Sequence, residues 1–102
     1  MTQANRQEVA VHKAMAHDPG DDVAVAVVPI VAGEEVVVVY VDDEGEQRVR
    51  ALADVPYGHK VALQALAAGA PVTEYSTQVG VASSAIEPGD YVHVHNVKTA
   101  RW

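Results

Sequence analysis

A short motif, apolar-x-x-Gly-x-x-Val, constrains the fold of this chain more than any other feature of its sequence. The spacing predicts a tight turn in which the glycine takes a positive φ, followed at once by the start of a strand. The intervals between copies are uneven, which argues against a solenoid and favours a compact β domain whose chain doubles back repeatedly. The copies occupy residues 30–36, 55–61, 66–72 and 86–92.

Valine-rich runs between these copies favour strands as well. Residues 36–41 are a continuous apolar run, and valine fits a pleated surface better than a helix because its χ1 is restricted. The acidic segment 42–46 predicts a turn and residues 47–52 a returning strand, so this region should be a hairpin. Residues 61–69 fit a strand or a helical turn capped by glycine, and we expect a strand that leads into a short helical turn. The predicted fold class is therefore mainly β, with short helical turns.

Length and composition limit what such a chain can do. Its 102 residues, 49% of them hydrophobic, are sufficient for one folded domain. Residues 1–14 are weakly patterned, so we expect an N-terminal extension followed by a domain over residues 15–102. The formal net charge of −7 argues against nucleic-acid binding. No apolar run approaches the roughly 20 residues of a membrane span, no signal peptide is visible and cysteine is absent, which together favour a cytoplasmic location.

Histidines gather near the C-terminus, in residues 91–96. On an extended strand alternate side chains share a face, so Val92 and Val94 should point inward and His93 and His95 outward together. Two neighbouring imidazoles suit proton transfer, metal ligation or anion binding near neutral pH. The alternative is a half-buried strand whose solvent face happens to carry histidines.

A second group of polar side chains follows the glycine of the second motif copy. A turn glycine lets the backbone approach a ligand closely. If this turn and the histidine segment converge, they offer three imidazoles, one ammonium and one amide, a set that can bind a carboxylate and transfer a proton. The three imidazoles could also form a metal site. If the two turns lie apart, these are ordinary turn residues. The candidate residues are Gly58, His59, Lys60, His93, His95 and Asn96.

Five segments together resemble the SAF-type domain of the altronate and galactarate dehydratases. The resemblance extends from about residue 15 to residue 102, and its most specific parts are the Gly-His-Lys and His-Val-His-Asn elements. Two positions depart from the family pattern. Glu74-Tyr75-Ser76 stands where the family usually has Lys-Tyr-Gly, and Tyr91 stands where it usually has His. The segments are residues 22–26, 55–63, 66–72, 79–82 and 86–96, and Tyr75 also matches.

This resemblance implies a small β-clip domain with a role in a lyase. The expected reaction is β-elimination of water or sulfite from a 2-hydroxy or sugar acid, assisted by a divalent metal, iron being expected, that a partner chain mostly holds. The long hairpin and the C-terminal ending are similar to the small subunit of sulfolactate sulfo-lyases. We therefore expect a small subunit that pairs with a large catalytic chain and is inactive alone.

The same resemblance suggests roles for the candidate residues. His59, Lys60, His93 and His95 are the expected catalytic contributors, with His93 and His95 as possible metal ligands. The expected substrate-binding residues are Gly58 and Asn96.

Two other functions remain open from the sequence. The chain could be a non-catalytic SAF-type module that binds a carbohydrate acid or assists assembly. It could also be a structural homo-oligomer held together by the valine-rich strand at residues 36–41, with idle histidines. A partner gene for a large dehydratase-like chain would favour the lyase subunit over both.

Overall fold

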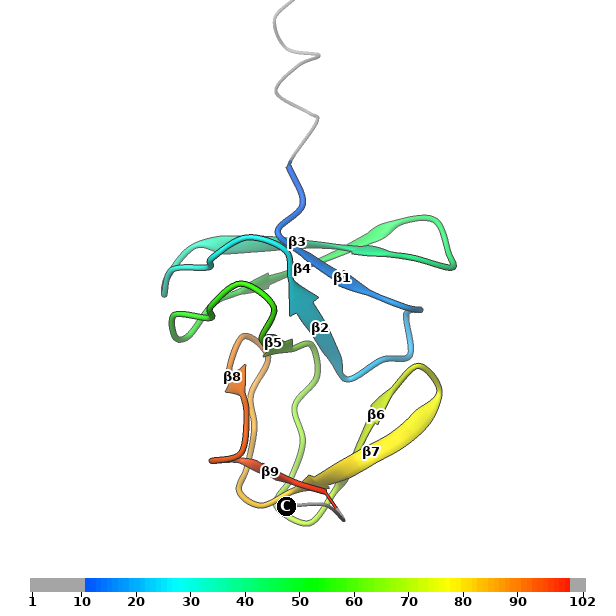
Figure 1. Ribbon diagram of the computed structural model, residues 1–102, viewed down its shortest axis with the longest axis vertical. Coiled ribbons are helices and arrows are strands. Elements are labelled where there is room, and N and C mark those ends of the chain that lie inside the picture. Colours follow the sequence, from blue (N-terminus) through cyan, green and yellow to red (C-terminus); the bar gives the residue numbers. More distant parts are fainter. Residues whose placement is uncertain (1–10, 100–102) are drawn as a thin grey trace, which may run out of the picture.

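The computed structural model describes residues 11–99, and these residues form nine strands and no helix (Figure 1). The predicted mainly-β class is confirmed. No helix that could cross a membrane occurs in this part of the chain. The strands are β1 (Ala14–Ala16), β2 (Val23–Ala26), β3 (Glu35–Tyr40), β4 (Glu46–Arg50), β5 (Lys60–Ala62), β6 (Pro71–Glu74), β7 (Thr77–Ala82), β8 (Tyr91–Val92) and β9 (Val97–Lys98).

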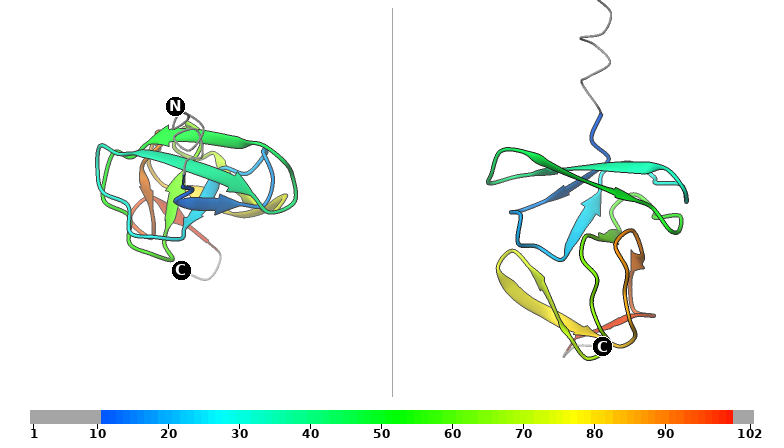
Figure 2. Two further views of the ribbon diagram at one scale, coloured as in Figure 1. Left: turned by 90° about the horizontal axis from the view of Figure 1, so that it is seen from above. Right: turned by 180° about the vertical axis from the view of Figure 1, so that it is seen from behind.

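The strands form two sheets, one at each end of the molecule (Figures 1 and 2). The larger sheet has the order β4-β3-β1-β2-β5-β8, and the smaller has the order β6-β7-β9. β1 pairs with β3 in parallel, whereas the other strand pairs are antiparallel. The predicted hairpin is confirmed as β3 and β4. Residues 1–10 of the predicted N-terminal extension lie outside the described residues, while Lys13 already donates its backbone N–H to Val37.

The four motif copies form four equivalent turns, as predicted. Their glycines have φ of 93°, 84°, 89° and 94°, and strands β3, β5, β6 and β8 each begin two residues later. In each copy the glycine N–H donates to the carbonyl of a buried alanine, and that alanine's N–H donates to the carbonyl of the residue after the glycine, with N···O distances of 2.7–2.9 Å. The glycine–alanine pairs are Gly33–Ala51, Gly58–Ala26, Gly69–Ala82 and Gly89–Ala62.

The turns also associate with one another in pairs. Ile30 and Val55 form an isolated antiparallel bridge between the first and second copies, and Leu66 and Ile86 form the same bridge between the third and fourth. Ile30, Val55 and Ile86 are at most 2% exposed. Each bridge therefore joins two turns around buried aliphatic side chains. This packing fixes the position of the residues that follow each glycine.

The core is built from small aliphatic side chains in two clusters, one for each end of the molecule. Two adjacent carboxylates join the two ends. Asp21 is fully buried and accepts hydrogen bonds from the backbone N–H groups of His17 and Tyr75, both at 2.9 Å. Asp22 accepts from the N–H of Thr73 at 2.7 Å. Because a buried carboxylate is costly unless it is hydrogen-bonded, this pair fixes the β1–β2 loop against the β6–β7 hairpin.

The helical turn predicted within residues 61–69 is wrong. β5 ends at Ala62, and a simple turn closed by the Ala70 N–H and the Ala67 carbonyl precedes β6. The reason is tertiary: the N–H groups of Leu63 and Leu66 donate to Asp22 and Ile86, so the hydrogen bonds of a helix cannot form there.

The valine-rich run at residues 36–41 is an internal strand of the larger sheet. Val36, Val37 and Val38 are buried, and both backbone edges of β3 are paired, with β4 and β1. Val41 lies beyond the strand and is 54% exposed. Most of the run is therefore covered within this chain, and association of copies through it stays a prediction.

Candidate functional site

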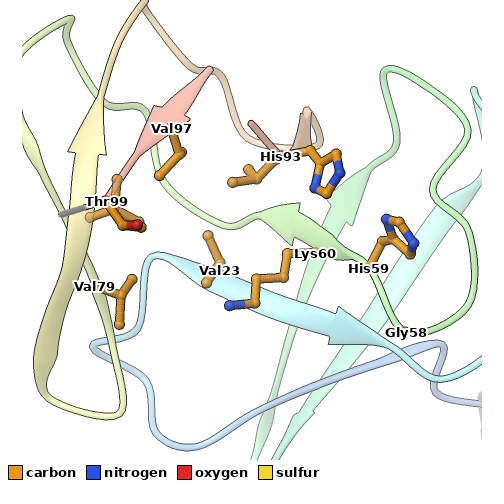
Figure 3. A pocket seen from close by; sticks show the side chains of 10 residues that line it. Val23, Gly58, His59, Lys60, Val79, His93, Val97 and Thr99 are labelled. Atoms are coloured by element: carbon orange, nitrogen blue, oxygen red, sulfur yellow. The ribbon is translucent and has the colours of Figure 1, made fainter. Parts of the chain in front are cut away.

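A pocket of about 340 Å³ lies where the two sheets meet (Figure 3). Strands β2, β5 and β8 of the larger sheet and β6, β7 and β9 of the smaller sheet all contribute to its lining. The second motif copy and the histidine segment therefore converge. The lining residues are Val23, Gly58, His59, Lys60, Val72, Val79, Val92, His93, Val97 and Thr99.

Polar and apolar side chains share the lining of the pocket. Figure 3 shows His59 and His93 on one side, with the Lys60 side chain extending toward the opposite side, which carries Val79 and Thr99. Five valines supply most of the remaining surface. A few polar groups converging on a largely apolar cavity is the usual composition of a small-molecule site.

His59 occupies the position directly after the glycine of its turn. In the first and fourth copies an acid stands there and accepts a hydrogen bond from the backbone N–H three residues earlier: Glu34 from Val31 at 2.7 Å, and Asp90 from Glu87 at 2.8 Å. In the second copy that earlier residue is Pro56, which has no N–H. The imidazole of His59 instead has its Nδ1 2.6 Å from the Tyr91 hydroxyl oxygen.

Lys60 begins β5 and is paired with an acid of the smaller sheet. Its Nζ lies 2.7 Å from Oε1 of Glu74, whose side chain is 19% exposed against 40% for Lys60. The carboxylate of Glu74 therefore balances the charge of the Lys60 ammonium. An ammonium has three N–H donors, so the ion pair leaves Lys60 able to bind a second acceptor.

The predicted strand through both histidines is wrong. β8 ends at Val92, and residues 93–96 form a turn in which Val94 is 54% exposed instead of pointing inward. Both side chains are exposed, but His93 lines the pocket and His95 does not. The alternation of a strand therefore does not apply to these two side chains.

Asn96 is the physical reason for this turn. Its Oδ1 accepts from the backbone N–H of His93 at 3.0 Å, and its Nδ2 donates to the carbonyl of Tyr91 at 2.9 Å. The side chain is 6% exposed and does not line the pocket. Asn96 thus mimics a backbone turn, a local bonding pattern that asparagine side chains favour.

Tyr91 was not predicted as a site residue, yet it lies among the three imidazoles. Its ring centroid is 5.6 Å from those of His59 and His95 and 5.7 Å from that of His93. The rings of His59 and His93 are 5.2 Å apart. The signal for it was its place two residues after the glycine of the fourth copy, equivalent to Lys60 in the second.

The three histidines do not assemble into a metal site. Within residues 11–99 there is no group of three or more His, Cys, Asp or Glu side chains placed to hold a metal ion. Nδ1 of His59 is hydrogen-bonded to Tyr91, and His95 lies outside the pocket. The described part of this chain therefore does not fit the predicted metal on its own.

Comparison with known proteins places the chain in a family. Residues 12–100 match the altronate/galactarate dehydratase SAF domain, so the chain belongs to this family and the resemblance predicted from its sequence is confirmed.

Three relatives are lyases or lyase subunits. The chain is 47% identical over 64 residues to (2R)-sulfolactate sulfo-lyase subunit alpha of Paracoccus pantotrophus, covering 63% of this chain and 96% of that subunit. It is 39% identical over 87 residues to the corresponding subunit of Chromohalobacter salexigens, covering 84% and 93%. It is also 40% identical over 79 residues to altronate dehydratase of Escherichia coli, which covers 78% of this chain and 15% of that enzyme.

Proposed function

We propose that this chain is the small subunit of a heteromeric lyase that catalyses β-elimination from a 2-hydroxy acid. The observation that carries the proposal is the convergence of His59, Lys60 and His93 on one pocket at the junction of the sheets. Family membership and two relatives named as alpha subunits, at 47% and 39% identity, support both the reaction class and the need for a second chain.

The reaction needs two tasks that these side chains can perform. A base removes the proton α to the carboxylate, the β-substituent leaves with its bonding electrons, and the resulting enol becomes a 2-keto acid. Lys60 is suited to bind the substrate carboxylate through the N–H groups that Glu74 leaves free. His59 or His93 is suited to accept the α-proton, because both line the pocket and a neutral imidazole has a nitrogen lone pair that can act as a base.

The site is proposed to be shared with a large subunit. Apart from His59, Lys60, His93 and Thr99, the pocket is lined by Gly58 and five valines, so this chain alone offers few polar partners to a charged substrate. The large subunit would supply further polar groups and the divalent metal that the resemblance implies. His95 is exposed, with its ring centroid 5.6 Å from that of Tyr91, and we propose that it contacts the partner chain.

Sulfite is the first leaving group to test, because two of the relatives are named sulfolactate sulfo-lyases. Water is the second, given the similar identity to altronate dehydratase. Both are lost from the carbon β to the carboxylate, so one arrangement of carboxylate ligand and base serves either. A cytoplasmic location belongs to the same proposal.

Co-expression with the large dehydratase-like chain of the same genome tests this function. Sulfite release and 2-keto acid formation are measured on a panel of 2-hydroxy acids with the complex and with each chain alone. We expect turnover only from the complex, and an activity loss of at least about tenfold in Lys60→Met. Lys98→Met, which removes an exposed lysine outside the pocket, is the matched control and should retain activity.

Three outcomes contradict the proposal. Turnover by the chain alone would rule out a shared site, and equal activity of the two lysine variants would remove Lys60 from it. Tight binding of a sugar acid by the chain, with no complex and no turnover, would instead establish the non-catalytic binding module.

A further inference from the structure

The contact between His59 and Tyr91 joins two turns of the molecule and is not explained by the fold alone. We propose that Tyr91 is a positioning residue that holds His59 through Nδ1 and thereby presents Nε2 to the reactant. This inference rests on the proposed function.

The four turns show that His59 is free to make this contact. The acids at the equivalent position, Glu34 and Asp90, are each bound to the backbone N–H of their own turn. Pro56 offers no N–H, so the side chain after Gly58 has no donor within its turn. The hydroxyl of Tyr91 is then the partner of Nδ1, at 2.6 Å.

Tyr91 is placed behind His59 and away from the reactant. His59 lines the pocket and Tyr91 does not, and Tyr91 is half-buried. Its backbone is fixed by the pairing of β8 with β5, in which Tyr91 lies opposite Val61. Its ring lies parallel to that of His93 within 8°, at 5.7 Å. The hydroxyl oxygen therefore has little freedom, which is the requirement for orienting a neighbouring ring.

The direction of this hydrogen bond decides which nitrogen of His59 carries the proton, because a tyrosine hydroxyl can either donate or accept. A neutral imidazole has one N–H and one lone pair, and the partner of one nitrogen sets the role of the other. In the proposed arrangement the Tyr91 oxygen is the acceptor, so Nδ1 carries the proton and Nε2 keeps the lone pair. Nε2 can then take the α-proton of the substrate, while Nδ1–H continues to donate to Tyr91 in the resulting imidazolium. Tyr91 itself neither gains nor loses a proton.

The tautomer can be measured in the full chain without a partner or substrate. Nitrogen–proton correlation spectra assign the protonated nitrogen of His59 in the wild type and in Tyr91→Phe, which removes only the hydroxyl oxygen. We expect Nδ1–H in the wild type and Nε2–H as the main form in Tyr91→Phe. Tyr57→Phe is the matched control, because Tyr57 lies in the same turn as His59 but is 69% exposed. An unchanged tautomer in Tyr91→Phe would overturn the proposal.

Kinetics of the two-chain complex give the second readout. We expect Tyr91→Phe to lower kcat about 10-fold to 100-fold, with a shifted pH profile and nearly unchanged KM, because a misplaced base affects the chemical step. Tyr57→Phe should keep the wild-type kcat. Equal kcat and pH profile in Tyr91→Phe and wild type would overturn the positioning role.

These readouts separate the two claims. A complex without lyase activity overturns the proposed function even where the tautomer changes as expected. A changed kcat with an unchanged tautomer overturns the role of Tyr91 alone. If Tyr91→Phe does not fold, Tyr91→Met provides an apolar side chain without a hydroxyl for the same measurements.

Discussion

Two turns of this molecule have the same backbone hydrogen bonds but differ in what the side chain after the glycine does. The Gly33 turn (residues 30–36) and the Gly58 turn (residues 55–61) make the same pair of hydrogen bonds to a buried alanine, and the Ile30–Val55 bridge joins them. They differ in the side chain after the glycine. In the Gly33 turn this side chain is bound within the fold, whereas in the Gly58 turn it lines the pocket.

The difference between these two side chains depends on one backbone N–H, which Val31 has and Pro56 lacks. Glu34 accepts from the N–H of Val31 at 2.7 Å and from the Lys13 ammonium at 2.6 Å. These contacts hold the pKa of Glu34 below its usual value, with the Lys13 hydrogen bond as the larger cause. Pro56 removes the equivalent N–H from the Gly58 turn. A shared scaffold can therefore stabilise the protein at one copy and present reactive groups at another.

The largest effect is expected from Gly89→Ala, and its comparison with Gly58→Ala tests whether equivalent turns have equivalent surroundings. In Gly89→Ala the added Cβ would overlap the backbone carbonyl of Arg50, and the residue would keep a φ of 94°. We expect a loss of more than about 3 kcal/mol in the free energy of unfolding, measured by urea denaturation. In Gly58→Ala no atom lies within 4 Å of the added Cβ, so only the strain of positive φ remains, about 1 kcal/mol. Similar losses in the two variants would contradict this difference.

A smaller effect is expected when the Gly33 turn is given the proline of the Gly58 turn. Val31 is 59% exposed and follows Ile30 as Pro56 follows Val55, so Val31→Pro should fit the backbone. Its gain in rigidity and its loss of the bond to Glu34 oppose each other, and stability should change by less than about 1 kcal/mol. A loss of several kcal/mol in urea denaturation would show that the two backbones are not equivalent.

The smallest expected effect is a pH dependence of stability that arises from Glu34 in the Gly33 turn. Because the pKa of Glu34 is lowered from 4.5 in the folded state, its contribution to stability is present above that value and is lost as the pH falls through the folded pKa. Thermal melting below pH 4.5 should therefore show a slightly shallower fall in Tm for Glu34→Gln than for the wild type. Identical pH profiles would show that the Lys13 contact contributes nothing. The difference should shrink in high salt, because the pair is partly exposed.

The repeated motif predicted much of this fold because its constraints are local. Each glycine adopts the positive φ that the spacing required, and each copy leads directly into a strand. The convergence of His59 and His93 depended on contacts distant in sequence, the pairing of β5 with β8 and the packing of the two sheets. The sequence therefore suggested the residues of the site but not that they meet.

The incorrect predictions also have local causes, which the alternation of side chains along the sequence does not reveal. The Tyr91–Asn96 segment alternates like a strand, but the amide of Asn96 bonds to the backbone at His93 and Tyr91 and turns the chain. Tyr91 was not predicted as a site residue, because its contact with His59 appears only when both turns are placed in space. The burial of Asp21 was equally invisible, since an acidic turn is normally exposed.

The activity of two matched variants tests the central claim most directly. In the two-chain complex, His59→Ala and Glu34→Ala each truncate the side chain after the glycine of an equivalent turn. We predict that His59→Ala lowers kcat by about 10²-fold to 10⁴-fold with little change in Tm. Glu34→Ala should lower Tm and leave kcat within about twofold of the wild type, because an interaction absent from the transition state does not affect the chemical step. Equal losses of kcat in the two variants would contradict the assignment of function to the Gly58 turn.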